Sequence, residues 1–507
     1  MERWQVISGV IALYLIITLT IGLVSGRGAS KSVTGYVAGD RDFGLLVLYF
    51  VLGASVFSAF AFLGGPGWTY SRGAAAYYIL SYGVLGMAPY FFIGPKAARI
   101  GRAKGYVTQA QLICGRFPSR ALSLVIALMT LAAFLPYITL QMRGAGIVIE
   151  AVTDGRVPLW FGAAAAYGVV ILYVLLSGAK AVGWTNTFQG IFMLVIAWSL
   201  GLYLPTHLYG GVGPMFEQIL AEKPALLTAP GLAADGSPWS WGAYSSAIIV
   251  SAAGLMMWPH LFMKAFTARS DTTLKRTVFL FPTFQIFLIP VFLIGFAGVL
   301  YETAPSSPDF IMPFMILNAD LPPLVVGLFC AGALSASMST GDALVHAAGS
   351  VAVEDAIGPF RKMSDTTRRR LIQFFVVLMG SVAYGFAVSG SASLVVLLLT
   401  AYGLICQLAP PIVAALYWKR ATTTGIIAGF VSGSLTAVFF FATGYAGMNL
   451  RPFDLHEGLL GLIVHVSVLI AVSLATKAQP SHHTCEFVSL SSSEASNDQH
   501  TAPEPVG

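Results

Sequence analysis

The stretch GASVFSAFAFLGGPGWTY, residues 53–70, decides the fold of this 507-residue chain. It belongs to an apolar segment long enough to cross a membrane, but glycine and proline interrupt it at position 53 and at the run GGPG, 64–67. Proline removes a backbone N–H donor, and glycine weakens a helix. The sequence therefore predicts a membrane helix that unwinds part-way. Backbone groups freed in this way are tolerated in a bilayer only where they face protein or a watery cavity.

A second apolar segment, 242–262, is interrupted in the same way by Gly254 and Pro259. It lies five predicted spans after the first, so with an odd repeat unit the two enter the membrane from opposite sides. Broken helices at matching positions of two halves are typical of inverted-repeat transporters, where they form a binding site near the bilayer midplane. The alternative is that glycine serves close packing between membrane helices.

The composition does not fit a soluble protein. Hydrophobic residues make up 56% of the chain and charged residues 10%, whereas a soluble protein carries roughly 25% charged residues. This argues against a soluble enzyme, a disordered scaffold and a secreted disulfide protein. The apolar runs are continuous, unlike the alternating strands of an outer-membrane barrel. The four cysteines are scattered without a CxxC pair, which argues against a disulfide framework or a zinc site.

The apolar runs predict thirteen membrane-spanning helices, each of about 20 residues. They cover residues 4–25, 45–70, 74–94, 121–149, 159–176, 182–204, 242–262, 278–300, 324–353, 371–388, 394–418, 425–441 and 459–474. Of the 28 Lys and Arg residues, 22 lie in the loops after odd-numbered spans or in the tail, 5 lie on the other side, and Arg143 lies within a span. The positive-inside rule then predicts a multi-pass plasma-membrane protein with its N-terminus outside and its C-terminus in the cytoplasm.

The ninth predicted span contains ASMSTGD, residues 336–342. Ser339 and Thr340 follow Ala336 by three and four positions, so both hydroxyls lie near the Ala336 carbonyl in a helix. A carbonyl and two hydroxyls form a neutral oxygen cluster that suits a hard, weakly bound monovalent cation. The alternative, which spacing alone favours, is that these hydroxyls bond back to carbonyls one turn earlier.

Asp342 and His346 lie four positions apart in the same span and share one helix face. Ionisable side chains inside a membrane are functional by default. A hydrogen-bonded link between helices is the alternative role for this pair.

Four motifs follow one another along the chain. They are GASVFSAFAFLGGPGWTY at 53–70, WPH at 258–260, SMSTGD at 337–342 and WKRATTTG at 418–425. Together they resemble the sodium:solute symporter family, nearest to its pantothenate, monocarboxylate and proline carriers. The resemblance covers the chain up to about Lys477.

This resemblance implies an all-α integral membrane protein with a five-plus-five inverted-repeat, LeuT-like core. The units are 1–43 with the N-terminal span and first cytoplasmic loop, 44–206 as the first repeat with spans 2–6, 207–240 as an extracellular loop, 241–421 as the second repeat with spans 7–11, 422–476 with spans 12 and 13, and 477–507 as a cytoplasmic tail. The tail is Ser-rich and polar without an apolar period, so we expect it to be disordered.

The resemblance also implies a sodium site between the second and ninth spans. Its ligands would be the backbone carbonyls of Ala54, Phe57 and Ala336 and the hydroxyls of Ser339 and Thr340. Solute would bind beside it, and ordinary packing is the alternative role for each candidate contact. Those candidates are Ser55, Val56, Ser58, Phe60, Tyr137, Gln141, Trp258 and Gln407.

Two departures from the family pattern matter. Val56 stands where some members have an acidic residue, which argues against a cationic solute. Asn186 stands where many members have an aspartate thought to lie on the inward sodium path, so this departure bears on the release route and on the identity of the coupling ion. We assign Asn186, Asp342 and His346 to the coupling-ion path.

The sequence thus predicts a secondary active transporter and not an enzyme. It would carry a small organic solute into the cell with sodium as the co-transported ion, by alternating access, in contact with membrane lipid and without cofactor or nucleic acid. The expected solute is a carboxylate such as a monocarboxylate, pantothenate or proline. The alternative is a proton-coupled symporter of the same solute class that uses Asp342 and His346.

Overall fold

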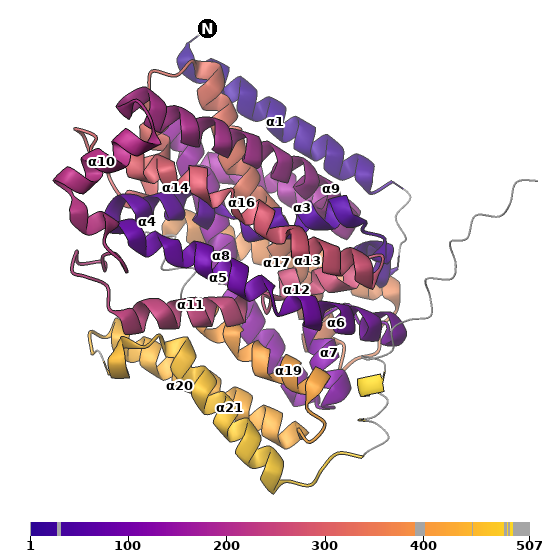
Figure 1. The fold of residues 1–507 in the computed structure, drawn as a ribbon. Coiled ribbons are helices and arrows are strands. Elements are labelled where there is room, and N and C mark those ends of the chain that lie inside the picture. Colours follow the sequence, from indigo (N-terminus) through magenta and orange to yellow (C-terminus); the bar gives the residue numbers. More distant parts are fainter. Residues whose placement is uncertain are drawn as a thin grey trace, which may run out of the picture.

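In the computed structural model, the regular elements of the described residues are helices, apart from two isolated backbone bridges (Figure 1). The structure describes residues 2–27, 32–390, 401–448 and 450–480, with residue 484 and residues 487–489. Most of the predicted tail, 477–507, and the first part of the eleventh predicted span, 394–418, lie outside these residues.

The α-helices are α1 (Arg3–Ser25), α2 (Val33–Ala38), α3 (Leu45–Val56), α4 (Gly65–Arg72), α5 (Tyr77–Met87), α6 (Tyr90–Lys104), α7 (Gln109–Arg116), α8 (Arg120–Val152), α9 (Leu159–Tyr209), α10 (Val212–Glu222), α11 (Trp241–Leu255), α12 (Pro259–Phe262), α13 (Asp271–Gln285), α14 (Leu288–Ala297), α15 (Ile311–Leu317), α16 (Pro323–Val351), α17 (Asp365–Ser389), α19 (Ala409–Tyr417), α20 (Thr423–Tyr445) and α21 (Glu457–Ala475).

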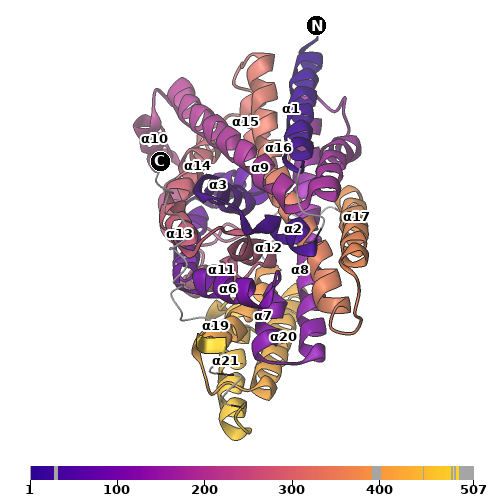
Figure 2. The same cartoon turned by 90° about the vertical axis from the view of Figure 1, so that its right-hand side faces the viewer.

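Helix α16 forms the centre of the bundle and packs against α1, α3, α8, α9 and α17 (Figure 2). Its most apolar stretch is 83% buried, whereas the corresponding stretches of α1, α17 and α21 are only 28% buried and lie on the outside. Small residues in α16 let its neighbours approach the backbone closely. At Gly341, for example, an added Cβ would lie 2.2 Å from the Tyr167 hydroxyl of α9.

Both predicted broken helices are present, but the first opens at 57–59, between Gly53 and the run 64–67, which are themselves helical. After α3 the chain resumes as a short π-helix, Phe60–Gly64, and the stretches Leu45–Val56 and Phe60–Met87 are inclined by 57°. After α11 it resumes at α12, and the stretches on either side are inclined by 46°. These two broken helices stand first in the two predicted repeats.

The predicted count of thirteen spans is not confirmed. Within the described residues, eight helices are long and apolar enough to cross a membrane, or up to ten if each bent pair is one span. The difference arises partly because α9 joins two predicted spans into 51 residues. A straight helix of that length would measure about 77 Å, more than twice the bilayer core of about 30 Å. Gly178, with φ of 56°, kinks α9 between those two predicted spans.

Three other predicted spans also merge or shorten. The helical stretch Phe60–Met87 joins the second half of the second predicted span to the third. The eleventh is described only as the shorter apolar stretch Ala401–Tyr417.

Helices α20 and α21 pack side by side at one edge of the bundle (Figure 1). Gly425, Gly429 and Gly433 recur every fourth residue and so form one face of α20. An added Cβ at Gly429 would lie 2.7 Å from the His465 carbonyl of α21. This close approach explains why the pair holds together beside the core.

Candidate functional site

Helix α3 ends in an open turn whose backbone is satisfied by side chains. Phe57 has φ −89° and ψ 86°, outside the helical region. The Ala59 N–H donates to Gln141 Oε1 of α8 at 2.9 Å, and the Phe60 N–H donates to the Ser58 hydroxyl at 3.2 Å. The turn is therefore a built feature in which released donors find new partners.

The two hydroxyls of α16 contact the last turn of α3. Ser339 Oγ donates to the Ala54 carbonyl at 2.8 Å and to the Ala336 carbonyl at 3.3 Å. Thr340 Oγ1 lies 3.2 Å from the Ser55 carbonyl and 3.4 Å from that of Ala54. Four of the five residues predicted to bind sodium thus meet where the broken helix crosses α16.

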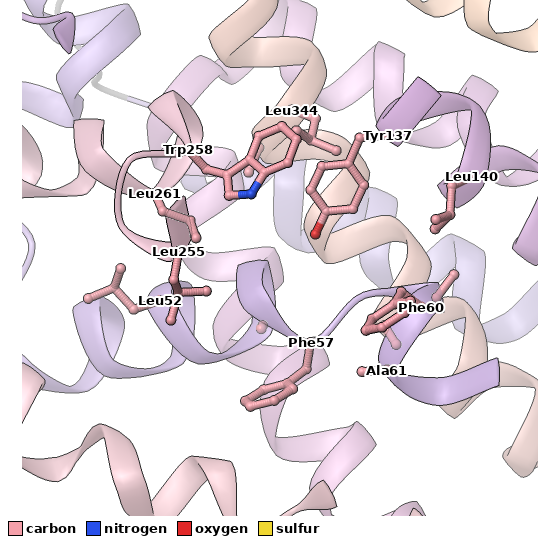
Figure 3. Close-up of a cluster of buried hydrophobic side chains, with 14 of the residues drawn as sticks. Leu52, Phe57, Phe60, Ala61, Tyr137, Leu140, Leu255, Trp258, Leu261 and Leu344 are labelled. Carbon is pink, nitrogen blue, oxygen red and sulfur yellow. The ribbon is translucent and has the colours of Figure 1, made fainter. Parts of the chain in front are cut away.

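The fifth residue predicted to bind sodium, Phe57, lies at the end of α3. Its ring stacks on Phe284 at 5.4 Å between centroids and points away from Tyr137 and Trp258 (Figure 3). Any contribution from Phe57 to an ion site must therefore come from its backbone carbonyl, as the family resemblance implies.

Asn186 of α9 joins this cluster. Its Nδ2 donates to the Ser339 carbonyl at 2.9 Å and to the Ser55 hydroxyl at 3.1 Å. Because a carbonyl only accepts, the amide nitrogen must face Ser339, which leaves Oδ1 as the remaining atom. That oxygen is buried and makes no hydrogen bond to the described residues.

Asp342 and His346 contact other helices. Asp342 Oδ2 accepts from the Tyr173 hydroxyl at 2.7 Å and the Thr185 hydroxyl at 3.2 Å, both on α9. His346 Nε2 donates to the Tyr36 carbonyl of α2 at 3.0 Å. These bonds fit the structural alternative for the pair, and their place on an ion path remains a hypothesis.

The predicted solute contacts of α8 and of the second break come together. Trp258 lies beside Tyr137, with 4.8 Å between ring centroids, and the Tyr137 hydroxyl points toward the turn between Phe57 and Phe60 (Figure 3). Gln141 lies one turn after Tyr137 on α8, so its amide faces the same turn. Six of the eight predicted solute residues are thus gathered at the two breaks and α8: Ser55, Ser58, Phe60, Tyr137, Gln141 and Trp258.

The other two predicted solute contacts differ. The Gln407 amide donates to the Gly458 carbonyl at 3.1 Å and its oxygen lies 3.2 Å from His465 Nδ1, so the side chain is held by α21. Val56 is the one solute candidate that is not buried. We therefore leave Gln407 and Val56 out of the proposed solute site.

Sequence reasoning missed two buried residues near the second break. His260 belongs to the WPH motif but has no predicted role, and Lys264 has no predicted role either. They are only 2% and 6% exposed, and the Lys264 ammonium interacts electrostatically with Asp342. The signal that could have found His260 is its position directly after Pro259, where the broken helix restarts, and Lys264 follows one turn further on.

The cluster has the chemistry of a neutral oxygen site. Carbonyls and hydroxyls supply its oxygens, and Asn186 adds an uncharged amide. No group of three or more His, Cys, Asp or Glu residues that could hold a metal occurs in the part of the chain that the structure describes. Such a site suits an alkali cation better than zinc or calcium.

Comparison with known proteins decides the family. The model of the sodium:solute symporter family matches residues 36–433. The chain belongs to the sodium:solute symporter family. This symporter is therefore a multi-pass membrane transporter of a sodium-coupled class, and it is not an enzyme.

Relatives cover almost the whole symporter. It is 27% identical to the uncharacterised symporter YhjB of Bacillus subtilis, over 91% of this chain and 96% of that one. It is 24% identical to a monocarboxylate transport permease of Rhizobium johnstonii, over 92% and 96%. A substrate-bound, outward-open structure of a Na+-coupled sialic acid symporter superposes with a TM-score of 0.77 at 17% identity, over 94% and 99%. That likeness shows a shared fold.

Proposed function

We propose that this symporter carries a small organic carboxylate into the cell together with sodium, by alternating access. The observation that carries the proposal is the contact of the Ser339 hydroxyl with the Ala54 carbonyl at 2.8 Å, because it joins the broken α3 to α16 through oxygen atoms alone. Sodium would bind between the carbonyls of Ala54, Phe57 and Ala336 and the hydroxyls of Ser339 and Thr340.

The hydrogen bonds at this crossing suit an ion that binds and leaves. Each hydroxyl donates to a carbonyl, so the oxygens are paired when no ion is present. When sodium enters, the hydroxyls would turn their lone pairs toward it and exchange weak hydrogen bonds for ion–dipole contacts. A neutral site holds the ion without the strong attraction of clustered carboxylates.

Coupling follows if both ligands favour the same conformation. Sodium bound between α3 and α16 would stabilise the outward-open arrangement, and solute would bind at the same break. Each ligand then raises the affinity for the other by the same factor. The membrane potential adds about 2.3 kcal/mol per charge per 100 mV. We place the two rocking halves at 44–206 and 241–421, in the plasma membrane with the N-terminus outside.

Two observations support a carboxylate as the solute. The Rhizobium relative is named for monocarboxylate transport, and the solved structural neighbour for sialic acid, which is itself a carboxylic acid. Val56 also leaves the first break without an acidic side chain that would attract a cationic solute.

The full chain is reconstituted into lipid vesicles, and uptake is measured with and without a sodium gradient across the vesicle membrane. Uptake of lactate, pantothenate, proline and a neutral sugar would be compared, and we expect sodium to drive uptake of an acid. In a Ser339→Ala, Thr340→Ala variant, the loss of two ligands should raise the sodium concentration for half-maximal uptake by about tenfold or more.

Ser335→Ala is the matched control for this variant. Ser335 lies one turn earlier on α16, and its hydroxyl bonds to the Ala331 carbonyl and Tyr14 instead of α3. It should leave the sodium dependence unchanged. An unchanged sodium dependence in the double variant would contradict the site.

Proton-coupled transport of the same solutes is the second candidate. One observation favours it: Asp342 Oδ1 is buried and makes no hydrogen bond within the described part of the chain. In the same vesicles, uptake that persists without sodium and collapses with the pH gradient would support this candidate and contradict sodium coupling.

A further inference from the structure

Some buried polar atoms near the break after α3 have no hydrogen-bond partner. Side chains toward α8 and α12 have unpaired donors, whereas those toward α9 and α16 have unpaired oxygens. Toward α8 and α12, the buried atoms without a hydrogen bond to the described residues are Trp258 Nε1, Gln141 Nε2 and both ring nitrogens of His260. Toward α9 and α16 they are oxygens, among them Asn186 Oδ1 and Asp342 Oδ1. Buried polar groups in folded proteins are nearly always paired, so each unpaired cluster calls for a ligand.

Each side chain in this set on the α8 and α12 side carries at least one unpaired donor. An indole N–H donates and never accepts. The Gln141 amide is fixed because its oxygen already accepts the Ala59 N–H, which leaves the NH₂ group free. A neutral imidazole adds one N–H donor, and its second ring nitrogen accepts. A ligand that pairs all three side chains must present acceptors.

The second break holds His260 in this cluster. Its ring lies 5.8 Å from the rings of both Tyr137 and Trp258 and 5.9 Å from that of Phe134, between centroids. Pro259 starts α12 immediately before it, so the position of the imidazole follows from the place where the helix restarts. The ring is 2% exposed, and the Ser55 backbone lies close to it without completing a hydrogen bond.

We propose that His260, together with Trp258 and Gln141, binds the carboxylate of the transported solute, and that His260 selects acids over their neutral analogues. A carboxylate only accepts hydrogen bonds and has about four lone-pair sites, enough for these donors. A carboxamide would turn an NH₂ group toward the same donors and leave them unpaired. Sites built to hydrogen-bond a ligand reject analogues that lack the matching group.

This assignment also places the two ligands on opposite sides of one turn. The Ser55 carbonyl accepts from Thr340 in the sodium cluster, and the Ser55 backbone lies beside His260. A bound carboxylate and a bound sodium would therefore attract each other across this turn, whose Ser55 and His260 are buried, and charges interact strongly in a buried place. That attraction is a physical route for the coupling that symport requires.

The inference rests on the proposed function, and its test separates the two. The full chain is purified in detergent, and thermal unfolding is followed in sodium chloride or choline chloride. Three acid and amide pairs are titrated in each salt: propionate and propionamide, lactate and lactamide, and proline and prolinamide. We expect at least one acid to stabilise the wild type in sodium while its amide does not.

His260→Gln and His260→Asn each retain one amide donor, at the positions of Nε2 and Nδ1. We expect one of them to keep part of the acid response, and His260→Ala to weaken half-saturation by about tenfold or more. A variant counts only if sodium alone still stabilises it, which shows that it is folded. His465→Gln is the matched control, because His465 is a buried histidine with one unpaired nitrogen that lies against α20, far along the chain from the site.

Three results would overturn the inference: no acid stabilises the wild type, amides act as well as acids, or all His260 variants respond to acids like the wild type. If sodium still stabilises the wild type in those cases, the sodium site of the proposed function stands and only the carboxylate site is lost. If sodium itself has no effect, the proposed function fails.

Discussion

Asn186 is the residue through which α9 contacts the oxygen cluster proposed to bind sodium, and by the family resemblance it stands where many members carry a carboxylate. Its amide nitrogen donates to the Ser339 carbonyl and the Ser55 hydroxyl. A neutral amide can therefore hold α3, α9 and α16 together before any ion arrives. A carboxylate in the same place would repel the Ser339 carbonyl until a cation came between them.

We therefore expect Asn186→Asp to lower stability without sodium and to increase the response to sodium. Loss of the two donor contacts in a buried place should cost about 1–3 kcal/mol in choline chloride. The new charge should then make the sodium-induced rise in unfolding temperature larger than in the wild type. Thermal unfolding of the purified protein in both salts measures the two effects.

Asn318→Asp is the matched control. The Asn318 amide also donates to a backbone carbonyl, that of Phe314 at 2.8 Å, but on the exposed end of α15. It should leave the sodium response unchanged. An Asn186→Asp protein that is as stable as the wild type in choline and gains no more from sodium would contradict the role of this amide.

At the residue level, the sequence could predict which oxygens matter but not what they contact. Spacing alone favoured back-bonding of Ser339 to Ala336, and that bond exists at 3.3 Å. The shorter bond, to Ala54, crosses to a helix 285 residues away. Helical periodicity carries no information about such a partner, and only the family resemblance pointed to it.

At the level of elements, the break in α3 depends on a side chain from another helix. Gln141 Oε1 accepts the Ala59 N–H that the helix released. We expect Gln141→Leu to leave this donor buried and unpaired and to destabilise the solute-free protein by about 1–3 kcal/mol. Chemical or thermal unfolding without added solute measures this change.

Gln285→Leu serves as its control. Gln285 is also buried, but its amide makes only long contacts of 3.3 and 3.5 Å with the Ile79 and Leu80 carbonyls. Gln285→Leu should lower the free energy of unfolding by less than Gln141→Leu does. Equal or greater destabilisation by Gln285→Leu would mean that Gln141 has no special part in the break.

The kink in α9 allows a second test at the level of elements. Gly178 has φ of 56°, and an added Cβ would lie 2.5 Å from the Tyr36 carbonyl. We expect Gly178→Ala to strain the backbone and collide with α2, at a cost of about 1–3 kcal/mol or more. The yield of monodisperse protein and its unfolding temperature should both fall.

Gly168→Ala is the control on the same helix, because nothing lies within 4 Å of its added Cβ. It should be neutral or slightly stabilising, since alanine favours a helix. A Gly178→Ala protein that behaves like Gly168→Ala would contradict the kink.

The sequence predicted that these two spans break, because glycine and proline act locally. It placed the first break at Gly53 and 64–67, whereas the chain leaves the helix at 57–59, where a side chain of α8 accepts a released backbone donor. It also left a gap between two predicted spans around Gly178, although the helix there continues through the gap as α9. Hydropathy therefore found the apolar segments but not how they join. The span count depends on how kinked and merged helices are divided, and that is a property of packing.

At the scale of the whole molecule, the charge distribution makes a prediction that the arrangement of helices does not test. Of the 28 Lys and Arg residues, 22 lie in loops assigned to one side. Such asymmetry sets orientation during insertion, because positive loops stay in the cytoplasm. The loop 207–240 should then face outside and the loop around Lys362 should face the cytoplasm.

Cysteine labelling in intact cells checks this orientation. All four native cysteines are first replaced by alanine, and single cysteines are introduced as Asp235→Cys or Lys362→Cys at exposed positions. We expect a membrane-impermeant maleimide to label Asp235→Cys in intact cells, and Lys362→Cys only after the membrane is opened. The cysteine-free chain should stay unlabelled in both conditions. The reverse pattern would place the N-terminus inside and contradict the predicted orientation.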